Sequence, residues 1–260
     1  MAPSPSGVIT LLTDFGLRDP FVGVMHGVIL SRFPAGRVVD LSHGVAPQAL
    51  DEAAFWLERS YRWFPPGSVH VAVVDPEVGT ARAALVVAAH ERFFVAPDNG
   101  LLGEIAHTLD AEVRHVDLER VGLGPPSRTF HGRDVFAPVA AELAAGRLPL
   151  DGVGPQGGAR RLTPAAGPRV VSVDRFGNLI TDIEASALAA FARPVVVVAG
   201  RELPIAGTYA EVPDQEAVAL VSSFDTLEIA VRNGNASSVL GVQRGAGVFL
   251  REAAPNNRLA

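Results

Sequence analysis

Cysteine is absent from the 260-residue chain. Its absence excludes disulfides, thiolate metal sites and a cysteine nucleophile, and it fits a protein kept in a reducing cytoplasm. Basic residues are few, since 22 Lys and Arg stand against 28 Asp and Glu and the formal net charge is −6. We therefore expect no nucleic-acid partner and no anionic membrane surface, and a small-molecule substrate fits better.

Long apolar runs and targeting signals are also lacking. No apolar stretch reaches membrane-spanning length without a charge or a turn residue. The opening residues MAPSPSG hold no basic region and no apolar core, so we expect no signal peptide there. With 48% hydrophobic and 19% charged residues, the composition predicts a soluble globular protein with one large domain or two modest ones.

The first half of the chain alternates between strand-like and helix-like segments. This alternation predicts an α/β fold with a mainly parallel sheet flanked by helices, in which ligands bind off the carboxyl ends of the strands. The expected strands are 8–13, 37–41, 69–74, 84–89 and 93–96, and the expected helices are 21–33, 47–62, 99–109 and 135–145.

The composition changes after residue 147, where Gly and Pro become frequent, as is typical of a linker. Short strand-like runs follow, and they predict a smaller C-terminal β-barrel or sandwich. We expect an N-terminal α/β domain over 7–150, a linker over 151–168, a β-barrel domain over 169–254 and a loose tail. The expected strands of the second domain are 170–173, 178–183, 194–198, 217–221, 227–231 and 247–251.

The first expected strand ends on a carboxylate, Asp14, which is followed by Phe15 and Gly16. A carboxylate at a strand end can accept both hydroxyls of a ribose. The alternative is an Asp that only caps a turn before glycine. The triplet DFG also occurs in protein kinases, but no Gly-rich phosphate loop, strand lysine or HRD segment accompanies it, which excludes that class.

A second strand end carries Asp75, and Arg82 follows seven residues later. Turn residues Pro76 and Gly79 lie between them and predict a loop that folds back, which would bring the guanidinium to the carboxylate. Such an ion pair favours the charged carboxylate. From the spacing alone, a purely structural ion pair is the commoner explanation.

His131 stands among charged residues and glycine just before an expected helix, which is a suitable place for a residue that accepts or orients a proton. Most of the seven histidines are expected to be structural or to face solvent. A metal site is the natural competitor for scattered Asp and His. The sequence holds no HExxH, no EF-hand loop and no paired His at helical spacing, so we expect no metal.

Two turn motifs stand out in the second half, at 174–178 and 232–236. Turns that contain Gly and Asn supply free backbone and side-chain amides, which can read an adenine edge or an amino-acid head group. The alternative is a pair of ordinary β-turns in a small barrel.

Taken together and in order, six motifs resemble the family of S-adenosyl-L-methionine (SAM) hydrolases that form adenosine. These enzymes are also called SAM hydroxide adenosyltransferases and are related to fluorinase and chlorinase. The resemblance runs from about Val8 to the last strands of the barrel. The motifs are TDFGLRDPFVG, VVDPEVGTAR, APDNGLL, TFHGRDVFAPVAA, VDRFGNLITDI and LEIAVRNGNAS.

The resemblance implies an N-terminal α/β domain, a C-terminal β-barrel and a homotrimer that binds SAM between the N-terminal domain of one subunit and the C-terminal domain of its neighbour. It also assigns roles to residues of this chain. The implied catalytic set is Asp75, Arg82 and His131; the implied contacts are Asp14 to the ribose diol, Asp19, Asp174 and Ser222 to methionine, and Asn178, Asn235 and Ala236 to adenine.

Three positions depart from the family's usual residues. Phe21 stands where tyrosine is frequent, His26 where lysine is frequent, and Glu77 where glycine is usual. A carboxylate of Glu77 facing the site beside Asp75 would disturb its charge. We expect Glu77 to point to solvent instead.

The reaction implied is hydrolysis of SAM to adenosine and L-methionine, a nucleophilic substitution in which water attacks the ribose 5′-carbon in line. No cofactor is implied. Methionine departs from the sulfonium as a neutral molecule and needs no proton. The enzyme therefore needs a positioned, partly desolvated water and no general acid.

Two alternatives stay open. One is a SAM-dependent halogenase, which a charged Asp75 disfavours because it would repel a halide. The other is a non-catalytic SAM- or adenosine-binding protein, which the intact Asp-Arg-His set disfavours.

Overall fold

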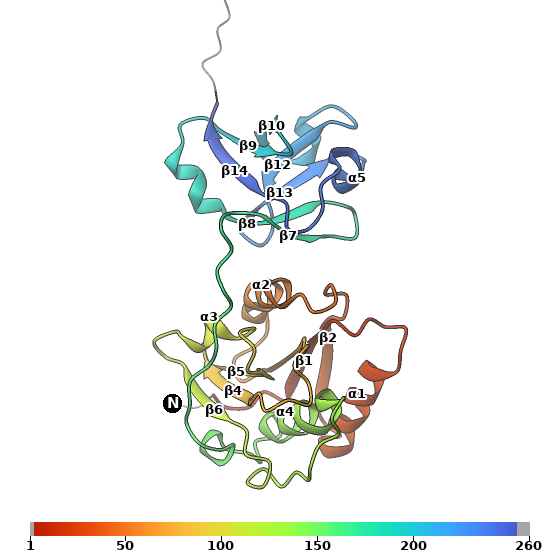
Figure 1. Ribbon diagram of the computed structural model, residues 1–260, viewed down its shortest axis with the longest axis vertical. Coiled ribbons are helices and arrows are strands. Elements are labelled where there is room, and N and C mark those ends of the chain that lie inside the picture. Colours follow the sequence, from red (N-terminus) through yellow and green to blue (C-terminus); the bar gives the residue numbers. More distant parts are fainter. Residues whose placement is uncertain (1–2, 254–260) are drawn as a thin grey trace, which may run out of the picture. The chain divides into compact units, whose positions relative to one another are not determined.

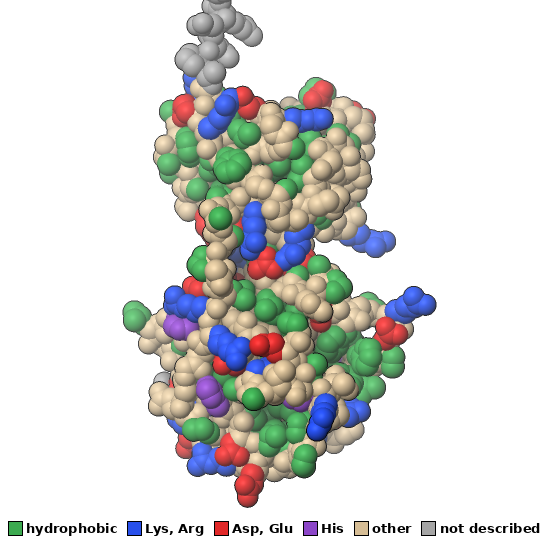
Figure 2. Space-filling view, viewed as in Figure 1, with side chains coloured by type: hydrophobic (Ala, Val, Ile, Leu, Met, Phe, Trp, Pro, Cys, Tyr) green, Lys and Arg blue, Asp and Glu red, His purple; other side chains and the backbone are tan. Residues whose placement is uncertain are grey.

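The computed structural model describes residues 3–253, and these form two compact units that divide between Thr163 and Pro164 (Figure 1). The tail expected over 255–260, and the last expected residue of the barrel domain, residue 254, lie outside the described residues. Within the described part of the chain, no helix is both long and apolar enough to cross a membrane. On the face seen in Figure 2, basic and acidic side chains are interspersed over each unit rather than gathered by sign.

The first unit is built on a six-stranded sheet in the order β2-β1-β3-β5-β4-β6. Three of its five pairings are parallel, and β4 and β6 run antiparallel to their neighbours. The α/β prediction with a mainly parallel sheet is therefore confirmed. The strands are β1 (Val8–Thr13), β2 (Arg37–Ser42), β3 (Val69–Val73), β4 (Ala84–Ala89), β5 (Arg92–Pro97) and β6 (Glu112–His115).

Helices cover both faces of this sheet (Figure 1). On one face, α1 (Phe21–Arg32) and α4 (Ala137–Ala144) contribute to an apolar cluster with β1, β3 and β5. On the other face, α2 (Leu50–Ser60) and the short α3 (Gly103–Ala106) pack against the same strands. Strands β1 and β3 are buried along their whole length, which is why both read as near-continuous apolar runs, interrupted only by Thr10, Thr13 and His70.

Two of the expected helices differ from the prediction. The helix expected over 99–109 is reduced to α3, because Gly100 has a φ of +97° and the Asn99 side chain bonds to the backbone of Val74 and Leu101. These features make a turn of the segment, so that prediction was wrong in its extent. The helix expected over 135–145 begins earlier, as a π-helical turn over Gly132–Phe136 that continues into α4.

The second unit is mostly antiparallel β-structure. A five-stranded sheet runs β11-β12-β13-β8-β7 and a three-stranded sheet runs β10-β9-β14. A single bridge between Arg169 and Gly247 links β7 to the start of β14, and both sheets contribute to one apolar core, so the strands curl into an incomplete barrel. The elements are β7 (Val170–Val173), β8 (Leu179–Glu184), β9 (Pro194–Val198), β10 (Arg201–Leu203), β11 (Ile205–Ala206), β12 (Ala217–Val221), β13 (Thr226–Val231), α5 (Ala236–Leu240) and β14 (Val248–Glu252).

Candidate active site

Polar side chains of the first unit follow the carboxyl ends of its parallel strands. Asp14 follows β1, His43 follows β2, Asp75 follows β3 and Asn99 follows β5. Because parallel strands end at the same edge of a sheet, these side chains share one rim of the unit, which is where α/β folds bind ligands.

Asp75 and Arg82 form a buried, two-point ion pair. Arg82 Nε donates to Asp75 Oδ1 at 3.0 Å, and Arg82 Nη2 donates to Asp75 Oδ2. The side chains are only 5% and 2% exposed. A further Arg82 nitrogen, Nη1, donates to the carbonyl of Ala83, and the guanidinium lies over the ring of Phe136. The geometry is that of a carboxylate and a guanidinium that satisfy each other away from water.

His131 joins this pair through Arg82. Its Nδ1 lies 2.7 Å from Arg82 Nη2. Because a guanidinium has no lone pair to offer, Nδ1 accepts, and the proton of the neutral ring sits on Nε2. Burial, and then the charge of Arg82, lower the pKa of His131, so the imidazole is neutral at pH 7. The structure thus brings together Asp75, Arg82 and His131, with the arginine in the middle.

Two loops come into contact to build this cluster. Gly79, in the loop between Asp75 and Arg82, has a φ of +79°, and a Cβ there would lie 2.3 Å from the carbonyl oxygen of Arg128. Turn hydrogen bonds from Val78 to Asp75 and from Thr80 to Glu77 fold this loop back on itself. The return of the chain that the sequence predicts is therefore present, and it seats the loop against the segment that leads to His131.

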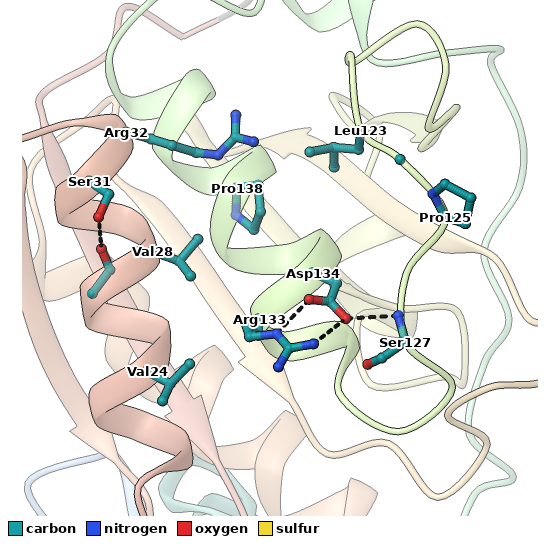
Figure 3. A pocket seen from close by; sticks show the side chains of 12 residues that line it. Val24, Val28, Ser31, Arg32, Leu123, Pro125, Ser127, Arg133, Asp134 and Pro138 are labelled. Carbon is teal, nitrogen blue, oxygen red and sulfur yellow. Dashed lines mark hydrogen bonds and ion pairs between the residues drawn. The ribbon is translucent and has the colours of Figure 1, made fainter.

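The segment before His131 is fastened by Asp134. Its Oδ2 accepts the backbone N–H of Ser127 at 2.8 Å, and both of its oxygens accept from Arg133 (Figure 3). The hydrogen bonds from Arg133 lower the pKa of Asp134 to about 2. Asp134 and Arg133 also line a groove of about 790 Å³ beside α1 and residues 123–127. Asp134 therefore closes the turn from which the His131 side chain projects.

Glu77 pairs with Arg160 at the surface. Its Oε2 lies 2.9 Å from Nη1 of Arg160, and both side chains are about half exposed. The Glu77 carboxylate is thus engaged by a cation at the surface. Of the other departures, Phe21 packs edge-on against Phe15 and Phe130, and His26 pairs with Asp40.

Asp14 is half-buried, and its Oδ2 accepts the backbone N–H of Gln48 at 2.9 Å. Asp19, in the turn before α1, is exposed.

In the second unit, the loop 174–178 packs against the start of α5. Asp174 accepts the backbone N–H groups of Phe176 and Asn178 and the side-chain amide of Asn178. Gly177 accepts from the backbone of Ser237, and a Cβ at Gly177 would overlap the Asn235 side chain, which itself caps α5. The structure therefore brings together Asp174, Asn178, Asn235 and Ala236. Ser222 lies in the turn between β12 and β13, where its hydroxyl contacts Thr226.

Comparison with known proteins decides the family. A family model described as the SAM hydroxide adenosyltransferase N-terminal domain matches residues 9–154, and one described as the C-terminal domain of the same family matches residues 168–249. The chain belongs to the SAM hydroxide adenosyltransferase family.

Several relatives of this family member carry functional names. A protein named (R)-S-adenosyl-L-methionine hydrolase from Thermus thermophilus is 43% identical over 259 residues, covering 93% of this chain and 98% of its own. A protein of the same name from Salinispora tropica is 39% identical over 258 residues, covering 94% and 97%. A fluorinase from an Actinoplanes species is 27% identical over 220 residues, covering 70% and 74%.

Among solved structures, an uncharacterized conserved protein from Thermotoga maritima has a TM-score of 0.85 and 37% identity, covering 93% of this chain and 99% of that chain. The likeness to a solved structure over nearly the whole of both chains agrees with the fold described above.

One buried carboxylate of the second unit, which bonds to a tyrosine, was not predicted from the sequence. Glu228 of β13 is buried and accepts a hydrogen bond from the Tyr209 hydroxyl at 2.6 Å. Burial raises the pKa of Glu228, and the nearby charge of Asp174 adds to this rise. The signal was a lone acid inside the apolar run LEIAV. Among the described residues, no three His, Asp or Glu side chains are grouped so as to hold a metal ion.

Proposed function

We propose that this protein hydrolyses SAM to adenosine and L-methionine, with water as the nucleophile. The observation that carries the proposal is the buried Asp75–Arg82–His131 cluster at the ligand-binding edge of the first unit. Family membership supports it, as do the relatives named (R)-S-adenosyl-L-methionine hydrolase at 39% to 43% identity.

The reaction needs little acid–base catalysis. A lone pair of water forms the bond to the ribose 5′-carbon, the C5′–S bond breaks, and its electrons neutralise the sulfonium as methionine leaves. Only the water must lose a proton, and Asp75 is the base that accepts it or holds the water in line. Arg82 fixes the Asp75 carboxylate from one side, and the neutral His131 offers an N–H at Nε2 that can orient the water. The sulfonium activates its own leaving group, so no cofactor is required.

Water is favoured over a halide. A halide site needs neutral hydroxyl and amide donors, whereas the Asp75 carboxylate would repel an anion beside it. The fluorinase relatives are also less similar, at 27% to 30% identity over 56% to 70% of this chain. Product masses measured with and without chloride or fluoride separate the two reactions, because adenosine and a 5′-halogenated adenosine differ in mass.

The relatives' name suggests which sulfonium epimer is the substrate. We propose that this chain also prefers the R configuration at sulfur. The preference is measured by supplying each epimer separately and comparing kcat/KM, and equal values for the two would contradict it.

The residues proposed to contact SAM are divided between the two units, with Asp14 and Asp75 in the first and Asp174 and Asn178 in the second. We propose, as the family resemblance implies, a homotrimer in which the second unit of a neighbouring subunit completes the site of each first unit. The cysteine-free composition supports a cytoplasmic location.

The direct test is incubation of the purified protein with SAM, followed by identification of the products by mass. We expect adenosine and methionine from the wild type, and a large loss of turnover in both Asp75→Ala and Asp75→Asn. Near-normal cleavage by both variants would remove Asp75 from the mechanism. Binding of SAM by the wild type without any product would support the non-catalytic alternative.

A further inference from the structure

A hydroxyl, an imidazole and a carboxylate stand in a row beside Asp14. Thr13, the last residue of β1, has its Oγ1 2.8 Å from Nδ1 of His43, and Nε2 of His43 lies 3.0 Å from Oδ1 of Asp40. The Thr13 residue is fully buried and the His43 side chain is 2% exposed, whereas the Asp40 side chain is 41% exposed. The same oxygen of Asp40 also meets Nε2 of His26, at 2.7 Å.

This row has the composition of a nucleophilic triad, but its hydroxyl does not face a substrate. Thr13 Oγ1 is enclosed and accepts the backbone N–H of Phe15 at 3.2 Å. Nε2 of His43 lies close to the Asp40 carboxylate but makes no hydrogen bond of good geometry with it. With the ring proton on Nε2, toward that carboxylate, Nδ1 accepts from the Thr13 hydroxyl. The hydrogen bonds therefore run in one direction, from the Phe15 N–H to the Thr13 hydroxyl and from that hydroxyl to His43. We call the row of Thr13, His43 and Asp40 the brace, because it holds the backbone in place.

What the brace holds is the segment that carries Asp14. Asp14 lies between Thr13 and Phe15, the two residues joined by the Thr13 hydroxyl. The next residue, Gly16, donates its N–H to the carbonyl of His43 at 2.8 Å, and Asp14 itself accepts from the N–H of Gln48. The loop after β2 thus fastens the segment after β1 at three points, two of which are on His43.

We propose that His43, with Thr13 and Asp40, is a positioning residue that sets the Asp14 carboxylate for binding the ribose hydroxyls of the substrate. This inference rests on the proposed function, in which Asp14 accepts the ribose diol. A carboxylate discriminates between a ribose and a deoxyribose only when it is held at hydrogen-bonding distance from both hydroxyls. Loss of the brace should therefore appear as loss of that discrimination.

The chain supplies a matched control on the same strand. Thr10, three residues earlier in β1, has its Oγ1 2.8 Å from Nδ1 of His70, and both residues are fully buried. Thr10→Val removes the same type of hydrogen bond from the middle of the sheet, and Thr13→Val removes it beside Asp14. Both variants lose a buried hydroxyl, so a merely structural effect should be similar in the two.

The experiment measures binding of adenosine, 2′-deoxyadenosine and 3′-deoxyadenosine by calorimetry. We expect wild type, Thr10→Val and Thr13→Ser to bind adenosine at least about tenfold more tightly than either deoxy compound, because a hydrogen bond to a charged group is lost. In Thr13→Val that preference should shrink to near unity, and the KM for SAM should rise with a smaller change in kcat. If Thr13→Val is too unstable to purify, His43→Gln is measured in the same way.

Full ribose discrimination in Thr13→Val, or in His43→Gln, would overturn the inference. A wild type that cleaves no SAM and binds adenosine no better than its deoxy analogues would overturn the proposed function instead. The two failures are distinguishable, because the first is seen only in the variants and the second is seen in the wild type.

Discussion

At the residue scale, Arg82 is the centre of the candidate site. It reaches both oxygens of Asp75, Nδ1 of His131 and the carbonyl of Ala83 while almost fully buried. A planar guanidinium with five N–H donors can serve these acceptors at once, and an ammonium cannot. The charge of Arg82 also helps to keep His131 neutral.

We therefore expect Arg82→Lys to lower kcat for SAM cleavage by about 100-fold, since Asp75 and His131 would lose their common anchor. Steady-state kinetics measure the effect, and circular dichroism confirms that the variant is folded. A folded variant with nearly unchanged kcat would show that the anchor is not needed.

Glu77 should matter little to turnover. It pairs with Arg160 at the surface, where an ion pair contributes about 0–1 kcal/mol. We expect Glu77→Gln to keep kcat within about twofold of the wild type, because the change leaves Asp75 and Arg82 in place. A large drop in kcat would instead show that the Glu77 carboxylate reaches the reacting groups.

The sequence predicted which three residues form the cluster, from their places in ordered motifs. It did not predict the central position of Arg82 or the tautomer of His131, because both depend on how deeply the loops at 75–82 and 127–131 are packed. Nor did it predict the brace on Asp14, since Thr13, His43 and Asp40 are joined only when β1 and β2 pair.

At the scale of elements, Gly79 is the point at which the two site loops touch. Its φ of +79° alone would cost an alanine about 1–2 kcal/mol, and the added Cβ would also collide with Arg128. Gly122 is a matched control, because its φ is +68° and nothing lies within 4 Å of the added Cβ.

We expect Gly122→Ala to lower the Tm by a few degrees with kcat retained. Gly79→Ala should lower kcat by at least about tenfold as well, because the Asp75 loop must move from the His131 segment. Thermal unfolding and kinetics on both variants measure this difference. Equal kcat in the two would contradict the role given to the loop contact.

The pairing of β1 with β3 buries His70. Burial, and to a smaller extent the charge of Arg92, lower the pKa of His70 to about 3. In the unfolded chain the ring takes up a proton near pH 6.5, so the native state loses stability as the pH falls from 6.5 towards 3. At pH 5 this amounts to about 2 kcal/mol relative to pH 7.

Urea unfolding at pH 7 and pH 5 tests this expectation in the wild type and in a Thr10→Val/His70→Phe double variant. The double variant removes the titrating ring together with its partner hydroxyl. The stability lost between the two pH values should be about 2 kcal/mol smaller in the double variant. An equal loss in both proteins would show that His70 does not contribute.

The elements themselves were largely predictable where burial decides them. Strands β1 and β3 read as apolar runs because both faces of the sheet are covered. The prediction of a helix over 99–109 was wrong in its extent. The apolar spacing of this segment is helical, but Asn99 and Gly100 form a turn that depends on a hydrogen bond to the backbone of Val74. The π-helical turn at Gly132–Phe136 has no simple sequence signal.

At the scale of the whole molecule, the division of the proposed SAM contacts between two units makes the proposed sharing of a site between subunits testable. Asp75→Asn and Asp174→Asn should each be inactive alone. Co-expressed in equal amounts, they should regain about a quarter of wild-type activity, since half of the first units and half of the second units at each shared site are intact. No recovery in mixed oligomers would place the whole site within one chain.

The proposed mechanism requires that water attack the ribose 5′-carbon of SAM. Cleavage of SAM in ¹⁸O-labelled water, with mass analysis of both products, tests it most directly. We expect adenosine that carries one ¹⁸O at its 5′-hydroxyl, unlabelled methionine, and no such product from Asp75→Asn. Unlabelled adenosine, a 5′-halogenated product or an absence of cleavage by the wild type would contradict it.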